Sequence, residues 1–405
     1  MKGIVNVNGL KLAILTMSVI QMTTNACSAI LADLGASFPE ASVSAVQYLM
    51  TFPNLMVVIV SFFISGITKH ISKRTAAAFG LFLACLAGIL SWQFHGSLIL
   101  LYVWAGMLGV GIGIVIPTAA SLISDYFSGE EKDSLMGLQT AAANAGGMVM
   151  TALGGVLASS DWSLNYLVYL LGAPGLILTL LFVPSKNTSS GDNPAAETED
   201  KNHGRGCKRI LGIESFAWKY FIIAALFMLL FYIGPTNVSM LTAERELGSA
   251  ASAGMAATLL LLGGFLMGLV FGKLAARIGE NTIPLGFMVL FAGFGMVYLI
   301  PNMAAVYIGF FIVGTGNSLV LPQCMGRMAI KDKARSTFLI SAVFAVANLG
   351  TFLAPALTAV ARLVTGNDLA ASRFLVACIL ALVLAIATKL MTGKEKQTGA
   401  AVQEV

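Results

Sequence analysis

The stretch LILLYVWAGMLGVGIGIVIPTAASLIS, residues 98–124, decides the fold, because it holds no charged side chain over its whole length. As an α-helix it would be about 40 Å long at about 1.5 Å per residue, enough to cross the ~30 Å hydrocarbon layer of a bilayer. Eleven further apolar runs of similar character lie on either side of it. We therefore predict twelve transmembrane helices, at residues 11–32, 42–67, 75–94, 98–124, 135–158, 162–183, 219–242, 251–272, 283–300, 303–326, 336–361 and 370–390.

The composition of the whole chain points the same way. Hydrophobic residues make up 57% of it and charged residues only 11%, whereas a soluble globular protein carries about 25% charged residues. The ten-residue alternation of a membrane β-barrel is not seen. The first run, interrupted by Gln21 and Asn25, is too long for the apolar core of a cleaved signal peptide, so we expect it to remain as the first helix.

The distribution of Lys and Arg predicts the orientation, because basic loops stay cytoplasmic. If both termini are cytoplasmic, only Arg245, Arg362 and Arg373 of the 24 basic residues fall on the other side. We therefore expect an integral protein of the bacterial inner membrane with both termini inside. The net charge of +5 then reflects contact with lipid rather than with nucleic acid.

The polar stretch between the sixth and seventh runs divides the chain. We expect an N-terminal six-helix bundle at residues 1–184, a cytoplasmic linker at 185–216, a C-terminal six-helix bundle at 217–390 and a cytoplasmic tail at 391–405. The end of the linker mixes basic and apolar residues, so it fits either a helix in the headgroup plane or a plain connection.

The two bundles repeat each other. Pro117 and Pro322 are 205 residues apart, each preceded by a Gly-X-Gly, and Asn144 and Asn348 are 204 apart in the fifth and eleventh runs. Such duplication is typical of transporters whose two halves rock about a site near the midplane.

Two loop sequences add a family resemblance. The stretch GKLAARIG, residues 272–279, and its degenerate copy SGITKHISKR, residues 65–74, resemble the loop signature of the major facilitator superfamily. The resemblance implies two pseudo-symmetric six-helix bundles that work by alternating access, with a conformational loop signature at Gly66, Lys73, Arg74, Gly272, Arg277 and Gly279.

The resemblance is incomplete in two places. The signature's acidic residue is replaced by Lys69 or His70 in the first copy and by Ala276 in the second. In the family that acid latches the cytoplasmic ends of the halves together. The arginine that many proton-driven members carry in the fourth helix would fall at Ala105, so proton antiport by the drug-exporter route is not supported.

Buried polar residues in a membrane need partners or a water-filled cavity, so they indicate the pathway. Gln21 and Asn25 belong to one polar stripe of the first helix, and Tyr232 and Asn237 flank the helix breaker Pro235. For the second, fifth and eleventh helices, hydrogen bonding between helices is an equal alternative to lining a cavity. The predicted substrate-binding residues are Gln21, Asn25, Gln47, Asn144, Tyr232, Asn237 and Asn348.

No Asp, Glu, Lys or Arg falls in the middle of a predicted span. Because an unpaired ion in a dry site is costly, we expect a neutral or amphipathic solute. Asp33 and Glu244, near helix ends, are the candidates for coupling transport to a proton. If neither serves, transport is facilitated or is driven by another ion or a counter-substrate.

We therefore expect a monomeric secondary transporter of a small solute, with export favoured. The alternatives are an uptake permease or uniporter for a neutral metabolite and a non-transporting membrane sensor. An enzyme is not expected, because His70, His95 and His203 lie in separate loops. Neither a cofactor nor a metal site is expected, since the five cysteines show no ligand spacing.

Overall fold

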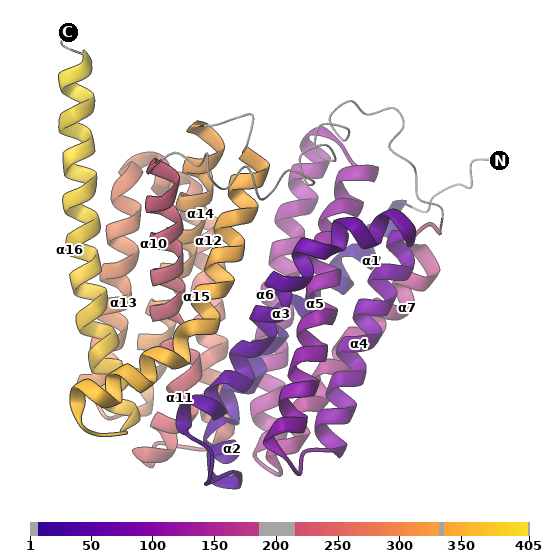
Figure 1. Ribbon diagram of the computed structural model, residues 1–405, viewed down its shortest axis with the longest axis horizontal. Helices are drawn as coiled ribbons and strands as arrows, with labels where there is room; N and C mark the ends of the chain where they lie inside the picture. The colour runs from indigo at the N-terminus through magenta and orange to yellow at the C-terminus, as the bar shows by residue number, and fades with distance from the viewer. Residues whose placement is uncertain (1–6, 186–214, 332–335, 404–405) are drawn as a thin grey trace.

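The computed structural model describes residues 7–185, 215–331 and 336–403, which are helical and contain no strand. We call residues 7–185 the first half and residues 215–403 the second half. Twelve segments of these residues are long and apolar enough to cross a membrane. The prediction of an all-helical protein with twelve spanning helices in two bundles is confirmed (Figure 1).

The helices follow the predicted runs closely. The first half consists of α1 Val7–Ser18, η1 Val19–Ala29, α2 Leu31–Ser37, α3 Val43–His70, α4 Lys73–Gln93, α5 Leu98–Tyr126, α6 Gly129–Ala158, η2 Trp162–Gly172 and α7 Ala173–Phe182. The second half consists of α10 Ser215–Phe231, α11 Ile233–Glu244, α12 Ala250–Ile278, η4 Gly279–Asn281, α13 Thr282–Leu299, α14 Met303–Lys331, α15 Ser336–Thr365 and α16 Ala370–Gln403.

Two predicted helix ends are wrong. The predicted spans end at residues 67 and 272, but α3 continues to His70 and α12 to Ile278. A single glycine inside an apolar helix does not end it when the following residues still form helical hydrogen bonds. The helix α12 stops instead at Gly279, whose φ of 62° lies in the left-handed region that glycine adopts without strain.

The first spanning segment is not an α-helix throughout. Its middle, η1, is a 3₁₀-helix of 11 residues, which is long for this tighter and stretched conformation. With three residues per turn, Asn25 stands directly above Met22, and its amide nitrogen donates to the Met22 carbonyl oxygen at 3.3 Å. The polar side chains of this segment therefore do not lie along one face at α-helical spacing, as predicted, because the middle of the segment is a 3₁₀-helix.

Each half has its own tightly packed interior, and glycines let the halves approach each other. In the second half the rings of Phe294 and Phe374, both fully buried, lie 5.7 Å apart in an edge-to-face arrangement. Between the halves, α6 and α12 cross at Gly155 and Gly254. A Cβ atom added to Gly254 would lie 2.9 Å from the Thr151 carbonyl oxygen, so only glycine permits this approach.

Candidate functional site

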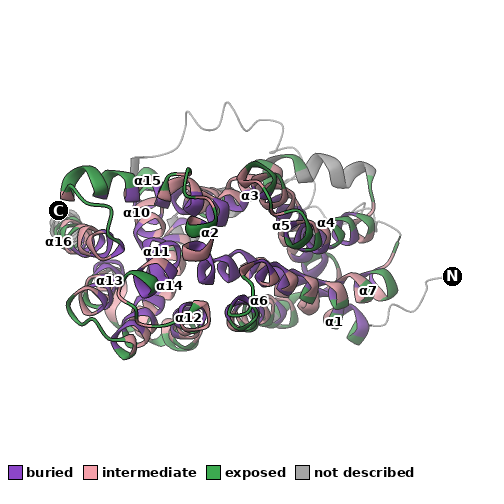
Figure 2. Cartoon of the chain, turned by 90° about the horizontal axis from the view of Figure 1, so that it is seen from below, coloured by how far each residue is buried: buried purple, intermediate pink, exposed green. Residues whose placement is uncertain are grey.

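The helix α1 begins and the helix α16 ends toward the same end of the molecule, the upper end in Figure 1. We call this the terminal end, and the opposite end, where α2 and α11 lie, the distal end. Seen from the distal end, buried segments fill the middle of the molecule between the two halves (Figure 2). The polar residues that meet there form the candidate site.

The centre of the site is a hydrogen bond between the halves. Gln47, in the first turns of α3, is fully buried, and its Nε2 donates to Asn237 Oδ1 at 2.7 Å and to the Thr236 carbonyl oxygen at 3.0 Å. Asn237 belongs to α11 and is also fully buried. Its own Nδ2 donates to the Ile233 carbonyl oxygen at 2.9 Å. Two amides predicted separately as site residues therefore bind each other across the interface.

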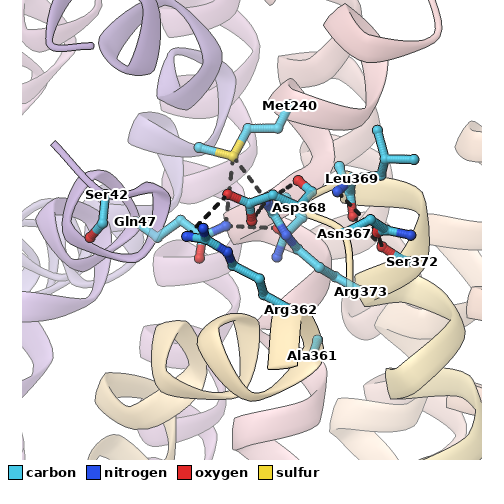
Figure 3. Close-up of polar contacts among 12 residues, drawn as sticks. Ser42, Gln47, Met240, Ala361, Arg362, Asn367, Asp368, Leu369, Ser372 and Arg373 are labelled. Carbon is cyan, nitrogen blue, oxygen red and sulfur yellow. Dashed lines mark hydrogen bonds and ion pairs between the residues drawn. The ribbon is translucent and has the colours of Figure 1, made fainter. Parts of the chain in front are cut away.

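A charged residue that the sequence placed on the outer side of the membrane, at the start of the last predicted span, joins this pair. Arg373, in the first turn of α16, is only 3% exposed, and its Nη1 donates to Asn237 Oδ1 at 2.8 Å. Its Nη2 donates to Asp368 Oδ1 at 2.8 Å and to the Asp368 carbonyl oxygen at 2.7 Å (Figure 3). The placement of Arg373 outside the apolar core is thus wrong.

Sequence patterns gave a weak signal for Arg373. A basic residue so near the start of a spanning helix usually extends to the headgroups, and only the contacts show that this one turns inward. The repeat could have identified it, since Arg373 follows Asn165 by 208 residues and both lie early in the last helix of their half.

Two further contacts join the first helix to α11. The Ser239 hydroxyl donates to the Ala29 carbonyl oxygen at 2.8 Å and accepts from the Ala32 backbone nitrogen at 3.1 Å. One turn or two deeper, the side chain of Asn25 lies beside the hydroxyl of Tyr232 across the same interface. Four of the seven predicted binding residues, Asn25, Gln47, Tyr232 and Asn237, therefore meet where the halves touch.

The other contacts between the halves lie in the same region. The rings of Tyr48 and Phe352 are 5.1 Å apart, and the Thr258 hydroxyl reaches the Met148 carbonyl oxygen at 3.4 Å. Tyr48, Thr258 and Met148 lie in the distal halves of their helices, and Phe352 lies at the middle of α15. Between described residues, hydrogen bonds join the two halves from the distal end to about the middle of the helices, where the Thr51 hydroxyl donates to the Phe352 carbonyl oxygen at 3.4 Å. The halves are thus joined through the distal parts of their helices.

The three remaining predicted residues stand apart from this cluster. Gln21 is half-buried, and among the described residues its buried Nε2 has no hydrogen-bond partner. Asn144 is half-buried on α6. Asn348 donates to the Phe344 carbonyl oxygen of its own helix at 2.9 Å. The structure therefore does not bring these three into the contact between the halves.

The two coupling candidates have different surroundings. Asp33 lies in α2, is half-buried, and its burial raises the pKa of its carboxyl group. Glu244 instead accepts from the backbone nitrogens of Ala370 and Ala371, so its carboxylate caps the start of α16. The structure gives Glu244 a supporting function that does not require a change of charge.

The loop-signature residues connect helices within each half. Lys73 forms an ion pair with Asp125 of α5, and Arg74 donates to the Leu180 carbonyl oxygen of α7. In the second half Arg277 lies in the last turn of α12, and the Gln323 side chain donates to the Gly279 carbonyl oxygen at 3.3 Å. Gly66 and Gly272 lie inside helices.

Comparisons with known proteins match this architecture. The family model described as Major Facilitator Superfamily matches residues 12–355. The putative glycerol-3-phosphate transporter 1 of Arabidopsis thaliana is 20% identical over 288 residues, which cover 60% of this chain and 54% of that protein. The chain thus aligns with about half the length of that relative.

Solved structures share the fold at low sequence identity. The nucleoside transporter NupG superposes with a TM-score of 0.73 at 12% identity, over 94% of this chain and 99% of that one. A bacterial homologue of the human lysosomal transporter Spinster, in an inward-facing and unoccupied conformation, gives 0.70 at 14% identity, over 95% and 96%. Because the family model covers most of its length, the chain belongs to the Major Facilitator Superfamily and is an integral membrane transporter of that type.

Proposed function

We propose that this transporter carries a small neutral or amphipathic solute by alternating access, with export favoured over uptake. The observation that supports the proposal most is the buried hydrogen bond that joins the halves near the distal end, from Gln47 to Asn237. Such bonds can break as a unit when the halves rock, and a site between the halves would then face the other side of the membrane.

The proposed orientation places the terminal end in the cytoplasm, as the distribution of basic residues predicts. An exporter loads its solute from that side, which lies away from the contact between Gln47 and Asn237. We also propose the division into bundles 1–184 and 217–390 with the linker 185–216 and tail 391–405, a location in the bacterial inner membrane and a monomeric state. A cysteine introduced in the linker should then be labelled only from the cytoplasm.

The charges near the pathway favour a neutral solute. In the described residues, the middle of the spanning segments carries no Asp, Glu, Lys or Arg, and Arg373 is occupied by Asp368 and Asn237. A phosphate ester such as glycerol 3-phosphate, named in one relative, calls for an available Arg or Lys. We therefore do not propose an organophosphate as the substrate.

The proposed binding residues lie inside the first spanning segment of each half. Gln21 and Asn25 lie in η1, toward the distal end of the first span, and Tyr232 lies between α10 and α11. The unpartnered Nε2 of Gln21 can donate to a carbonyl or hydroxyl oxygen of a solute. Asn144 and Asn348, on α6 and α15, would contact the solute on its way toward the terminal end.

The test begins with a thermal-shift screen that identifies a stabilising ligand, followed by flux measurements in proteoliposomes. Gln21→Ala and Asn25→Ala should each lower flux at least about tenfold, because a lost hydrogen bond to a bound solute costs about that factor. The control Thr118→Ala removes a buried hydroxyl that donates to the Ile114 carbonyl oxygen of its own helix, α5, and should transport normally. Parent-level flux in both test variants would remove these residues from the site, and the absence of flux for every ligand would favour a sensor.

A further inference from the structure

The side chain of Arg373 acts together with the Ile233 carbonyl oxygen, which accepts from Asn237 Nδ2 at 2.9 Å, to orient the amides at the distal end. A guanidinium group only donates hydrogen bonds, so the Asn237 atom that faces Arg373 at 2.8 Å is the amide oxygen. The same oxygen lies 2.7 Å from Gln47. Because an oxygen acceptor needs a donor opposite it, Gln47 must present its NH₂ group.

These contacts form a series of hydrogen bonds that leads from the second half to the first. Asp368 holds Arg373 through its carboxylate and its carbonyl oxygen, and Arg373 holds Asn237. These three residues belong to the second half, and only the last partner, Gln47, belongs to the first. When the halves separate, the bond to Gln47 breaks while the others remain within one rigid body.

The closed contact is also incompletely satisfied. Among the described residues, Gln47 Oε1 and Arg373 Nε are buried without a hydrogen-bond partner. An unpaired buried polar atom costs free energy, so the bond between the halves is weakened by its own surroundings. This suits a contact that must open and close repeatedly.

We propose that Arg373 is a positioning residue for closure of the distal end: it fixes the Asn237 oxygen toward Gln47 and so sets the balance between the closed and open states. The proposal rests on the alternating-access function proposed above. It assigns Arg373 no contact with the solute. Arg373 affects closure through the orientation of the Asn237 amide and not through its positive charge.

Closure can be measured without any substrate. Ala32 and Ser239 contact each other across the distal interface, so the pair Ala32→Cys and Ser239→Cys should form a disulfide when the distal end is closed. A protease site placed in the linker lets a non-reducing gel distinguish crosslinked from separated halves. Single-cysteine proteins control for crosslinks to the native cysteines, and the rate of oxidation reports the closed population.

Arg373→Gln and Gln47→Ala should each slow crosslinking about fivefold to tenfold, the usual effect of losing a buried hydrogen bond. Because both act on the same contact, the double variant should be no slower than Gln47→Ala alone. Arg373→Lys keeps a charge and a donor, so it should slow the reaction only about twofold. The matched control Asn165→Ala occupies the equivalent position of the first half and should crosslink at the parent rate.

Two outcomes would overturn the proposal: parent-rate crosslinking in Arg373→Gln, or an Arg373→Gln effect that adds in full to that of Gln47→Ala. If Arg373→Gln does not fold, judged by its thermal unfolding, Arg373→Lys replaces it in the same comparison. A normal crosslinking pattern combined with a lack of flux would leave the positioning function intact and refute the proposed transport instead.

Discussion

The last helix of each half begins at the distal end, and the two beginnings are built differently. In the first half Asp161 accepts from the backbone nitrogen of Ser163 at 2.8 Å, so the acid caps its own helix η2. Four residues later Asn165 donates to the Ala26 carbonyl oxygen at 3.0 Å. Both contacts end on backbone atoms of the same half.

In the second half the equivalent acid has another partner. Asp368, 207 residues after Asp161, binds Arg373 rather than the helix start, and Glu244 from α11 supplies the cap of α16. Arg373 then reaches the side chain of Asn237, which accepts from the opposite half. Because Glu244 caps the start of α16, Asp368 is available to bind Arg373 inside the bundle.

The difference between the two helix beginnings indicates that the second half controls the contact at the distal end. A side chain that binds a backbone carbonyl, as Asn165 does, fastens two helices and presents nothing to the other half. A side chain that orients another side chain, as Arg373 does, can determine whether the halves bind. The repeat therefore supplies the same positions twice, but only the second copy is used across the interface.

The substitution Asn237→Ala should have the largest effect on this comparison. It removes the acceptor that Gln47 Nε2 and Arg373 Nη1 share, while Arg373 keeps its ion pair with Asp368, and the loss of these buried hydrogen bonds costs about 3 kcal/mol. We expect a large fall in thermal stability and an almost complete loss of the distal crosslink. A melting temperature equal to that of the parent would show that water replaces the amide and that the contact is dispensable.

Asn165→Ala should have a smaller effect of another kind. It removes one neutral hydrogen bond to Ala26, so the free energy of unfolding should fall by about 1 kcal/mol. Flux and distal crosslinking should stay at parent levels, since no bond between the halves is involved. A change in crosslinking as large as that of the Asn237 variant would erase the distinction between the two helix starts.

The substitution Glu244→Gln tests whether Glu244 only caps α16 or also carries a proton during transport. The amide oxygen can still accept from Ala370, so we expect a loss of no more than about 1 kcal/mol, from the weaker interaction with the helix dipole. Accumulation in proteoliposomes under an imposed pH gradient should match the parent. If accumulation is lost while exchange of solute persists, Glu244 carries the coupling proton.

Asp33→Asn should have the smallest effect, and one that depends on pH. Burial raises the pKa of Asp33 above its ordinary value of 3.8, so the folded state binds the proton more tightly than the unfolded state. The parent therefore loses stability as pH rises from about 4 through the raised pKa. The variant should be slightly more stable at pH 7, by less than about 1 kcal/mol given partial exposure, and equal at pH 4. Thermal unfolding at the two pH values measures the difference.

The spanning helices were predictable because bilayer thickness and the cost of unpaired backbone groups act on composition alone. Gln47 and Asn237 were singled out for the same reason, as polar residues in apolar runs. Their pairing was not predictable, because it depends on how two distant helices are rotated against each other. Arg373 was missed because the direction of a long side chain near a helix end depends on packing and not on local pattern.

The 3₁₀ conformation of η1 and η2 has a mechanical consequence. At about 2.0 Å of rise per residue instead of 1.5 Å, a segment of 11 residues is about 5 Å longer than the same residues in an α-helix. Relaxation of η1 to an α-helix would shorten the first helix by this stroke and unwind its side chains by about 20° per residue, turning Gln21 relative to Asn25 by about 80°. The first half therefore holds an extended 3₁₀ segment, η1, beside the site, whereas α11, the counterpart of η1 in the second half, is an α-helix.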